Sequence, residues 1–459
     1  FTLALSAITL LFLAKSAGGN VFARVTAQRL FYLSSIIVTF AVILLFQAFL
    51  GHDFSITYVY QHSSFDLPIL YRFSAFWAGQ EGGFLLWLFF LSIIGIVIIL
   101  SKDENESILM SLLIITQVFI LINLTIKSPF ARLWETHPDQ FTRTLPMLLD
   151  GMGLNPLLQD FWMAIHPPVL FAGYAAAVVP FAYAVAALLK QDYSIMPKRA
   201  YRWVIFTVTA LGLGIFLGGY WAYAVLGWGG YWGWDPVENS SLVPWLLLIA
   251  LLHGIILQNR KGALVRTNLI LAMSSFVLVL YSTYLTRSGV LANFSVHSFA
   301  GDTVSHQILY YILFFIIIGA VLLAMRNRSI ISKPLDGTLL SSTNLLFYGI
   351  VLIILYTVMI LIGTSMPIIS GILMENATTV TEDFYNTWSI PVALLILSFI
   401  AIAAFYRGGT LKKATLAIIT AVSILTGVLF NLFHTAHPAA YLLSVFAVFT
   451  VLAIALDWL

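Results

Sequence analysis

The sequence has 459 residues and a formal net charge of only +3; 61% of its residues are hydrophobic and 9% are charged. A water-soluble chain is closer to half apolar and a quarter charged, so this composition excludes a soluble globular fold and requires lipid to cover much of the surface. The absence of cysteine excludes disulfides, thiolate metal sites and thiol chemistry by the chain itself.

Long apolar runs separated by polar breaks predict about thirteen membrane-spanning helices, because roughly 20 apolar residues are needed to cross the hydrocarbon core. In chain order the predicted spans are 1–14 (partial), 30–50, 84–100, 108–126, 168–189, 203–221, 242–257, 269–285, 308–325, 345–369, 390–406, 414–433 and 441–459. The predicted fold class is an all-α integral membrane protein, a polytopic helical bundle in which residues 1–459 form a single membrane domain. Because Phe1–Ala14 is short for a span, we expect the N-terminus to be incomplete.

Lys and Arg are distributed unequally between the two sets of loops that alternate along this pattern. One set holds 17 of the 22 basic residues, and the other set holds only Arg72, Lys127, Arg132, Arg143 and Arg287. The positive-inside rule places the basic set in the cytoplasm. The outer loops (51–83, 127–167, 220–241, 286–307 and 370–389) are longer and rich in aromatic residues, Gly, Pro and His, so functional residues are expected there.

The outer segment 220–241, YWAYAVLGWGGYWGWDPVENSS, interleaves tryptophan with glycine before Asp235 and Pro236 turn the chain. Glycine lets the backbone approach a flat object closely, and tryptophan supplies a broad apolar face with one N–H donor. These properties predict a platform for a large planar ligand at the membrane surface. The alternative is an aromatic belt at the membrane interface, although a belt requires neither the glycines nor a fixed order.

Histidines strengthen the first interpretation. His166 is expected in the outer loop before the fifth span, and His297 in the outer loop that follows the Trp segment. Two neutral imidazoles can hold a haem iron from opposite faces. His253 falls inside the seventh span, where an ionisable residue is a functional candidate; axial ligation of a second haem and a bond to a neighbouring helix both remain open. His434 and His437 lie too far toward the outside to pair with it.

The segment WGGYWGWDPVEN (228–239) resembles the tryptophan-rich WWD signature of the haem-handling proteins of cytochrome c biogenesis. Three further segments, FWAGQEGGFLLW (76–87), NPLLQDFWMAIHPPVLFAGY (155–174) and TRSGVLANFSVHSFA (286–300), narrow the resemblance. Their order and the number of spans are similar to CcmF, the family of large haem lyase subunits of the cytochrome c maturation system. A nitrite-reductase-specific paralogue of that subunit remains open.

The resemblance implies a role for each matching residue. His166 and His297 would ligate the iron of a haem that arrives on a haem chaperone, and His253 would hold a permanent haem b within the membrane. The platform that cradles the outer haem would comprise Trp221, Trp228, Gly229, Gly230, Trp232, Trp234 and Asp235. The family's second membrane histidine and its large C-terminal outer domain are not in this sequence, which ends at Leu459.

The family reaction implies a holocytochrome c synthase-type haem lyase, which joins haem to apocytochrome Cys-x-x-Cys-His motifs through thioethers. The implied partners are the haem chaperone, apocytochrome c, a thiol-handling subunit that binds apocytochrome, and membrane lipid, without nucleic acid. Quinone near His253 is one implied electron source. The implied location is the bacterial inner (cytoplasmic) membrane or the mitochondrial inner membrane, with the WWD segment on the outer face.

Two functions from other classes are the alternatives. A haem transporter or exporter without lyase chemistry predicts a row of polar residues through the bilayer, and an ion-coupled respiratory subunit predicts buried Lys/Glu pairs. The sequence shows neither pattern in its clear spans, which favours the haem lyase.

Overall fold

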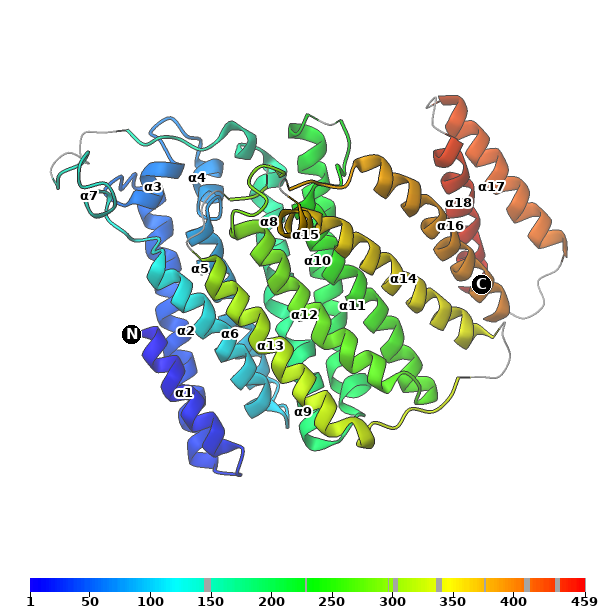
Figure 1. Ribbon diagram of the computed structural model, residues 1–459, viewed down its shortest axis with the longest axis horizontal. Helices are drawn as coiled ribbons and strands as arrows, with labels where there is room; N and C mark the ends of the chain where they lie inside the picture. The colour runs from blue at the N-terminus through cyan, green and yellow to red at the C-terminus, as the bar shows by residue number, and fades with distance from the viewer. Residues whose placement is uncertain are drawn as a thin grey trace. The chain divides into compact units, whose positions relative to one another are not determined.

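The computed structural model describes residues 1–143, 150–227, 229–295, 297–299, 304–335, 341–374, 377–407, 413–433 and 438–458. Within these ranges the chain is helical and has no β-strand; Ile56 and Arg132 form an isolated bridge. The α-helices are α1 (Thr2–Ser16), α2 (Val21–Leu50), α3 (Thr57–His62), α4 (Ile69–Ala75), α5 (Gln80–Leu100), α6 (Glu106–Ile126), α7 (Leu133–Thr136), α8 (Phe161–Ala176), α9 (Val178–Lys190), α10 (Tyr201–Val225), α11 (Pro236–Lys261), α12 (Val265–Arg287), α13 (Ser305–Arg326), α14 (Ser342–Thr364), α15 (Met366–Leu373), α16 (Glu382–Arg407), α17 (Lys413–Phe433) and α18 (Pro438–Trp458) (Figure 1).

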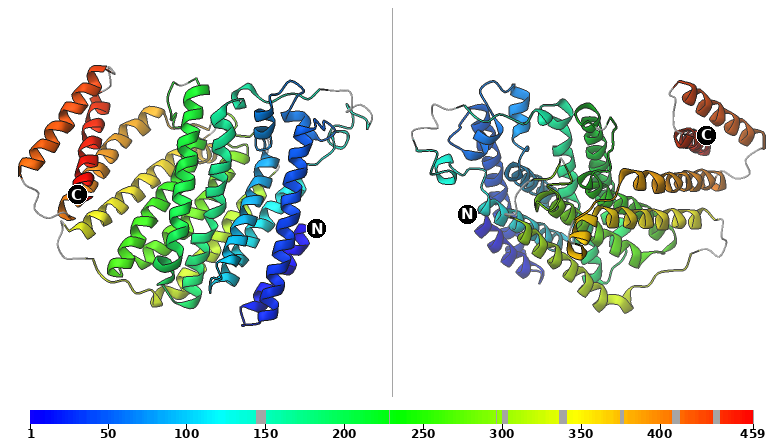
Figure 2. Two further views of the ribbon diagram at one scale, coloured as in Figure 1. Left: turned by 180° about the vertical axis from the view of Figure 1, so that it is seen from behind. Right: turned by 45° about the horizontal axis from the view of Figure 1, so that its top comes forward.

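Contacts divide the chain into two compact units, residues 1–248 with 269–330 and residues 249–268 with 331–459. In the first unit α8 packs against α10 and α5, and α5 packs against α6. The long helices of this unit run roughly side by side, with the short helices α3 and α4 at one end (Figures 1 and 2). In the second unit α16 packs against α14 and α18, and α18 packs against α17.

The helices have the length and composition of membrane spans. Among the described residues, 11 helices are long and apolar enough to cross a bilayer, and two shorter apolar helices cover Thr2–Ser16 and Leu416–Phe430. Bulky apolar side chains such as Phe40 and Phe216 are exposed, because in this environment lipid takes the place of a protein core. The predicted all-α membrane fold is confirmed, whereas the count of about thirteen spans stays a prediction.

Helix boundaries beside the predicted outer loops differ from the predicted ones. Asp160 caps α8 by accepting hydrogen bonds from the amides of Trp162 (2.8 Å) and Met163 (3.4 Å), so the helix begins at Phe161 rather than at residue 168. The expectation that His166 lies in a loop is therefore wrong, because His166 lies in the second turn of α8. Pro167 and Pro168 follow it inside the helix, as neighbouring helices permit in membranes.

The Trp segment is also more helical than predicted. Helix α10 continues to Val225, which includes Trp221, and α11 begins at Pro236. The connection between the two helices is therefore residues 226–235 rather than the whole of 220–241. The cause is local: Asp235 supplies an N-cap and Pro236 takes the first helical position, where its missing N–H costs nothing.

A buried tyrosine fixes the chain that leads into α5. The Tyr58 hydroxyl accepts from the Gly79 amide (2.8 Å) and donates to the Phe76 carbonyl (2.9 Å). Burial raises the pKa of this hydroxyl, so it keeps the proton that it donates. A Cβ at Gly82 would lie 1.6 Å from the Phe76 carbonyl oxygen, so only glycine allows this close turn. Tyr58 thereby holds the N-terminus of α5 against α3.

Because the chain has no cysteine, single cysteines can report its orientation. We expect Asp66→Cys, beside α4, to react with a membrane-impermeant maleimide in intact cells, and Lys198→Cys, between α9 and α10, to react only after the cells are opened. Helix α4 and the connection from α9 to α10 lie toward opposite ends of the first unit (Figure 1), and the charge bias places the second position in the cytoplasm. Equal labelling of both in intact cells contradicts this orientation.

Candidate functional site

In the described part of the connection between α10 and α11, Gly229 (φ 70°) and Trp234 (φ 53°) adopt the left-handed conformation. Trp234 is not glycine, so this backbone conformation costs energy unless other contacts hold it. The Asn239 side-chain amide holds it by donating to the Trp234 carbonyl (3.0 Å). The segment thus turns sharply just before α11. Trp228, one of the predicted platform residues, lies outside the described residues.

A reciprocal capping box starts α11 directly after this turn. The Asp235 carboxylate accepts from the amides of Val237 (2.8 Å) and Glu238 (3.4 Å). The Glu238 carboxylate reaches back to accept from the amides of Gly233 (2.9 Å) and Asp235 (3.3 Å). Such a box satisfies amides that the helix itself cannot pair, and it places negative charge at the positive end of the helix dipole. It explains the Asp-Pro-Val-Glu order in the sequence.

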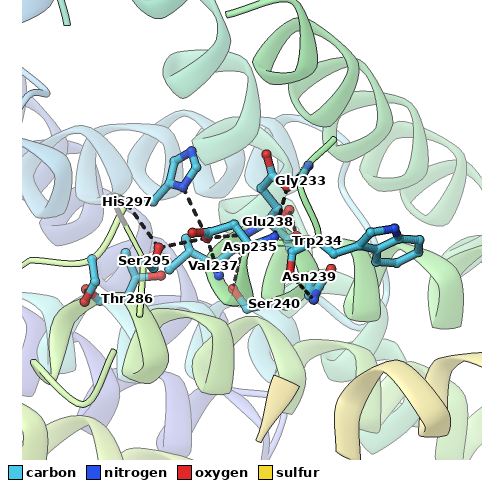
Figure 3. Close-up of polar contacts among 12 residues, drawn as sticks. Gly233, Trp234, Asp235, Val237, Glu238, Asn239, Ser240, Thr286, Ser295 and His297 are labelled. Carbon is cyan, nitrogen blue, oxygen red and sulfur yellow. Dashed lines mark hydrogen bonds and ion pairs between the residues drawn. The ribbon is translucent and has the colours of Figure 1, made fainter. Parts of the chain in front are cut away.

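The same Asp235 oxygen connects α11 to the loop that follows α12. Asp235 Oδ1 accepts from the Ser295 hydroxyl (2.8 Å), and His297 Nδ1 lies 3.2 Å from it (Figure 3). The Ser295 hydroxyl also accepts from the His297 amide (3.1 Å). Asp235 was predicted as part of the platform; in the structure its carboxylate lies beside the Nδ1 edge of the His297 imidazole.

His166 and His297 both contact one tryptophan. The Trp221 ring stacks on His166 with centroids 5.7 Å apart and meets His297 edge-on at 5.2 Å. Trp221 is itself fixed, because its indole N–H donates to the Leu157 carbonyl (2.9 Å). His166 Nδ1 is 3.0 Å from the Trp162 carbonyl; donation to that carbonyl places the lone pair on Nε2, where a metal can bind. The two histidines therefore lie at one place although 131 positions separate them in the sequence.

A cavity of about 290 Å³ opens at these side chains. Both histidines line it together with Trp221, Trp232, Glu238 and Arg287. These residues come from α8, α10, α11, α12 and the loops beside them, and the rest of the wall is mostly apolar. Mostly apolar walls with a few converging polar groups are typical of cofactor and ligand pockets.

The predicted platform residues divide into two groups. Trp221 and Trp232 line the cavity, whereas Gly229, Gly230, Trp234 and Asp235 are outside its wall within the described chain. The Trp234 indole extends away from His297 (Figure 3) and meets Trp232 edge-on at 6.1 Å. In the described part of 220–241, Trp221 and Trp232 therefore present aromatic faces to the cavity, whereas Trp234 and Asp235 belong to the turn before α11.

His253 lies in α11 within the second unit. Its Nδ1 is 2.8 Å from the Ile249 carbonyl, so Nε2 can carry the lone pair, as in His166. Among the described residues of that unit His253 is the only histidine, because His434 and His437 lie outside them. The ring of His253 is therefore fixed at Nδ1, and the described residues of the second unit supply no second histidine.

Ser295 and Arg287 are among the residues of the site that were not predicted as functional. Ser295 joins Asp235 to the His297 loop, and Arg287 was considered only as an outer basic residue. The sequence carries a signal for both, because they belong to the segment TRSGVLANFSVHSFA with His297. Their contacts depend on how this loop folds back: the Phe299 amide donates to the Thr286 carbonyl (2.9 Å).

The known proteins to which this chain is similar are cytochrome c assembly and biogenesis proteins. Residues 77–291 match the family described as Cytochrome C assembly protein. The chain is 34% identical to the cytochrome c-type biogenesis protein CcmF of Pseudomonas aeruginosa over 415 residues, 87% of this chain and 61% of that protein. It is 36% identical to the probable cytochrome c-type biogenesis protein NrfE of Escherichia coli over 366 residues, 78% of this chain and 64% of that protein.

A solved structure of the cytochrome c heme lyase CcmF has the same fold, with a TM-score of 0.75 and 25% identity. The match covers 100% of this chain and 69% of that one. The chain thus spans about three fifths of the length of the curated relatives named above.

The capping box yields a prediction for the His297 loop. We expect Asp235→Ala to destabilise the protein by about 1–2 kcal/mol, because α11 loses its cap and Ser295 loses an acceptor. Hydrogen–deuterium exchange of residues 288–299 should become faster in detergent. Asp160→Ala removes the cap of α8 and is the matched control: it should lower the melting temperature without changing exchange in that loop. Unchanged exchange in Asp235→Ala contradicts the link between the two segments.

Proposed function

Because this chain belongs to the CcmF and NrfE family of cytochrome c-type biogenesis proteins, we propose that it positions haem for attachment to apocytochrome c, as part of a cytochrome c haem lyase. The observation that carries the proposal is the cavity that brings His166 and His297 together beside Trp221 and Trp232. Two imidazoles and two indoles around one largely apolar space are the groups that a flat iron porphyrin needs.

In this proposal haem is the substrate. His166 Nε2 and His297 Nε2 bind the iron, and one of them yields to the histidine of the apocytochrome motif. Trp221 and Trp232 offer apolar faces to the porphyrin. Each cysteine S–H adds across a haem vinyl group, so that sulfur bonds to one vinyl carbon and the proton goes to the other. The addition needs no external oxidant, and the protein contributes position and orientation.

Asp235 supports this reaction without touching the substrate. Its carboxylate lies 3.2 Å from His297 Nδ1, so it favours the tautomer that donates from Nδ1 and leaves Nε2 for iron. The same carboxylate also anchors Ser295 (2.8 Å), so the loop that carries His297 is held in place. Trp228, Gly229, Gly230 and Trp234 would shape the turn beside the porphyrin.

His253 is proposed to hold a haem b in the membrane. Its Nδ1 contact with the Ile249 carbonyl orients the ring and makes Nε2 the ligating atom. The second ligand would come from residues outside the described chain or from another segment of the lyase. When bound, this haem supplies an electron that keeps the outer iron ferrous, and quinone is the proposed source of that electron.

The remaining proposals concern the membrane in which the protein works, its orientation and its partners. The protein would work in a bacterial or mitochondrial inner membrane, with the cavity on the outer face. A haem chaperone would deliver the substrate, and a thiol-handling subunit would present reduced apocytochrome c. Support comes from the charge bias of the loops and from the relatives named above as cytochrome c-type biogenesis proteins.

The histidine assignment is tested by adding ferric haem to the purified protein and recording its absorption spectrum. We expect the wild-type spectrum to be that of a six-coordinate low-spin haem, and we expect His166→Ala and His297→Ala each to give a five-coordinate form with weaker binding. Each variant loses one axial bond, and each should also abolish holocytochrome formation. His137→Ala, which changes a partly exposed histidine outside the cavity wall, is the control. If both cavity variants give the same spectrum as the wild type, His166 and His297 are not the iron ligands.

Alanine variants of Trp232 and Trp234 distinguish a haem platform from an aromatic belt. Trp232→Ala should weaken haem binding roughly 10-fold or more, because a lining indole is lost from the cavity. Trp234→Ala should have a smaller effect, because that ring extends away from the cavity. The measurement is the dissociation constant for haem by absorption titration in detergent. If neither substitution changes the dissociation constant, the aromatic belt is favoured. A larger change for Trp234→Ala than for Trp232→Ala contradicts the placement of Trp232 in the cavity wall.

A further inference from the structure

Arg287, the last residue of α12, is buried and lines the cavity. Its Nη1 donates to the Gln80 carbonyl (2.9 Å). A guanidinium has five N–H donors, so this bond uses only one of them. Among the described residues no carboxylate forms an ion pair with Arg287. The nearby acidic residue Glu81 is itself paired with Lys127 (3.2 Å).

Aromatic rings take the place of a counter-ion around this charge. The guanidinium carbon lies 4.2 Å from the ring centre of Phe84, 5.3 Å from that of Phe299 and 5.8 Å from that of Phe171. Ring faces stabilise a cation weakly and accept few of its hydrogen bonds. A buried charge without an anion is costly, so these surroundings stabilise Arg287 only in part.

Gly83 leaves room for the Arg287 side chain. A Cβ at Gly83 would come within 2.7 Å of Arg287 Nη2, so the glycine allows the guanidinium to lie against α5. Within the described chain, the buried indole N–H groups of Trp77 and Trp232 also line the cavity and make no hydrogen bond. Buried donors that remain unpaired usually indicate a ligand or solvent that is needed to pair them.

We propose that Arg287 binds a carboxylate of the cavity's ligand, which, if the proposed function holds, is a propionate of haem. Arginine suits this role because its planar fork matches a carboxylate and stays charged when buried. Haem carries its two propionates along one edge and its vinyl groups on other edges. Fixing the propionate edge at Arg287 while the histidines hold the iron sets which edge of the porphyrin meets the apocytochrome. Arg287 is thus a specificity-determining residue for haem orientation.

The test compares two porphyrins on the purified full chain: ferric haem and its dimethyl ester, in which both carboxylates are blocked. Wild-type protein should bind haem roughly 10- to 100-fold more tightly than the ester, the range expected for one charge-assisted contact. Arg287→Gln should lose this preference and keep the six-coordinate spectrum with both porphyrins. Arg287→Lys, which retains the charge, should keep part of the preference.

Arg72→Gln is the matched control, because Arg72 also donates to backbone carbonyls, those of Leu67 (2.6 Å) and Phe65 (3.1 Å), but does not line the cavity. It should leave the preference unchanged. Equal binding of haem and ester by the wild type, or a preference that survives in Arg287→Gln, overturns the role of Arg287 alone. Failure of the wild type to bind either porphyrin overturns the proposed function and this inference with it.

Discussion

One carboxylate, that of Asp235, joins the three parts of the site. It caps α11, accepts from Ser295 and faces His297 Nδ1 (Figure 3). A helix N-terminus favours an anion, so the charge that stabilises the helix also orients the histidine. Without this residue the turn after Trp234, the start of α11 and the loop after α12 would have no shared fixed point. The placement of His297 in the same cavity as His166 depends on it.

The lipid environment explains why so little polar chemistry is spread through the chain. Within a bilayer each unpaired polar group is expensive, so charged groups of the first unit lie near helix ends, whereas polar groups inside the helices pair with one another, as Gln117 does with Ser92 (3.2 Å). The cavity lies at such a place, between the start of α8 and α11 and the ends of α10 and α12. Arg287 also lies at a helix end, but it needs an explanation because it carries a full charge among aromatic rings.

Sequence patterns predicted the helical membrane fold, because long apolar runs have few other solutions. They also placed His166, His297 and Trp232 in outer segments, and the structure brings these three to one cavity. They failed at helix ends: the polar cap Asp160 and the prolines after His166 looked like a loop, whereas the cap starts a helix there. Nor could they find the Asp235–Ser295 bond, because 60 positions separate the two residues and only the folded loop brings them together.

The central claim is that the iron of a bound haem lies between His166 and His297. The most direct measurement is an experimental structure of the protein loaded with haem. The account predicts porphyrin density in the cavity beside Trp221 and Trp232, with iron bonded to Nε2 of both histidines. Porphyrin density at another place, or iron bonded to neither histidine, would contradict it.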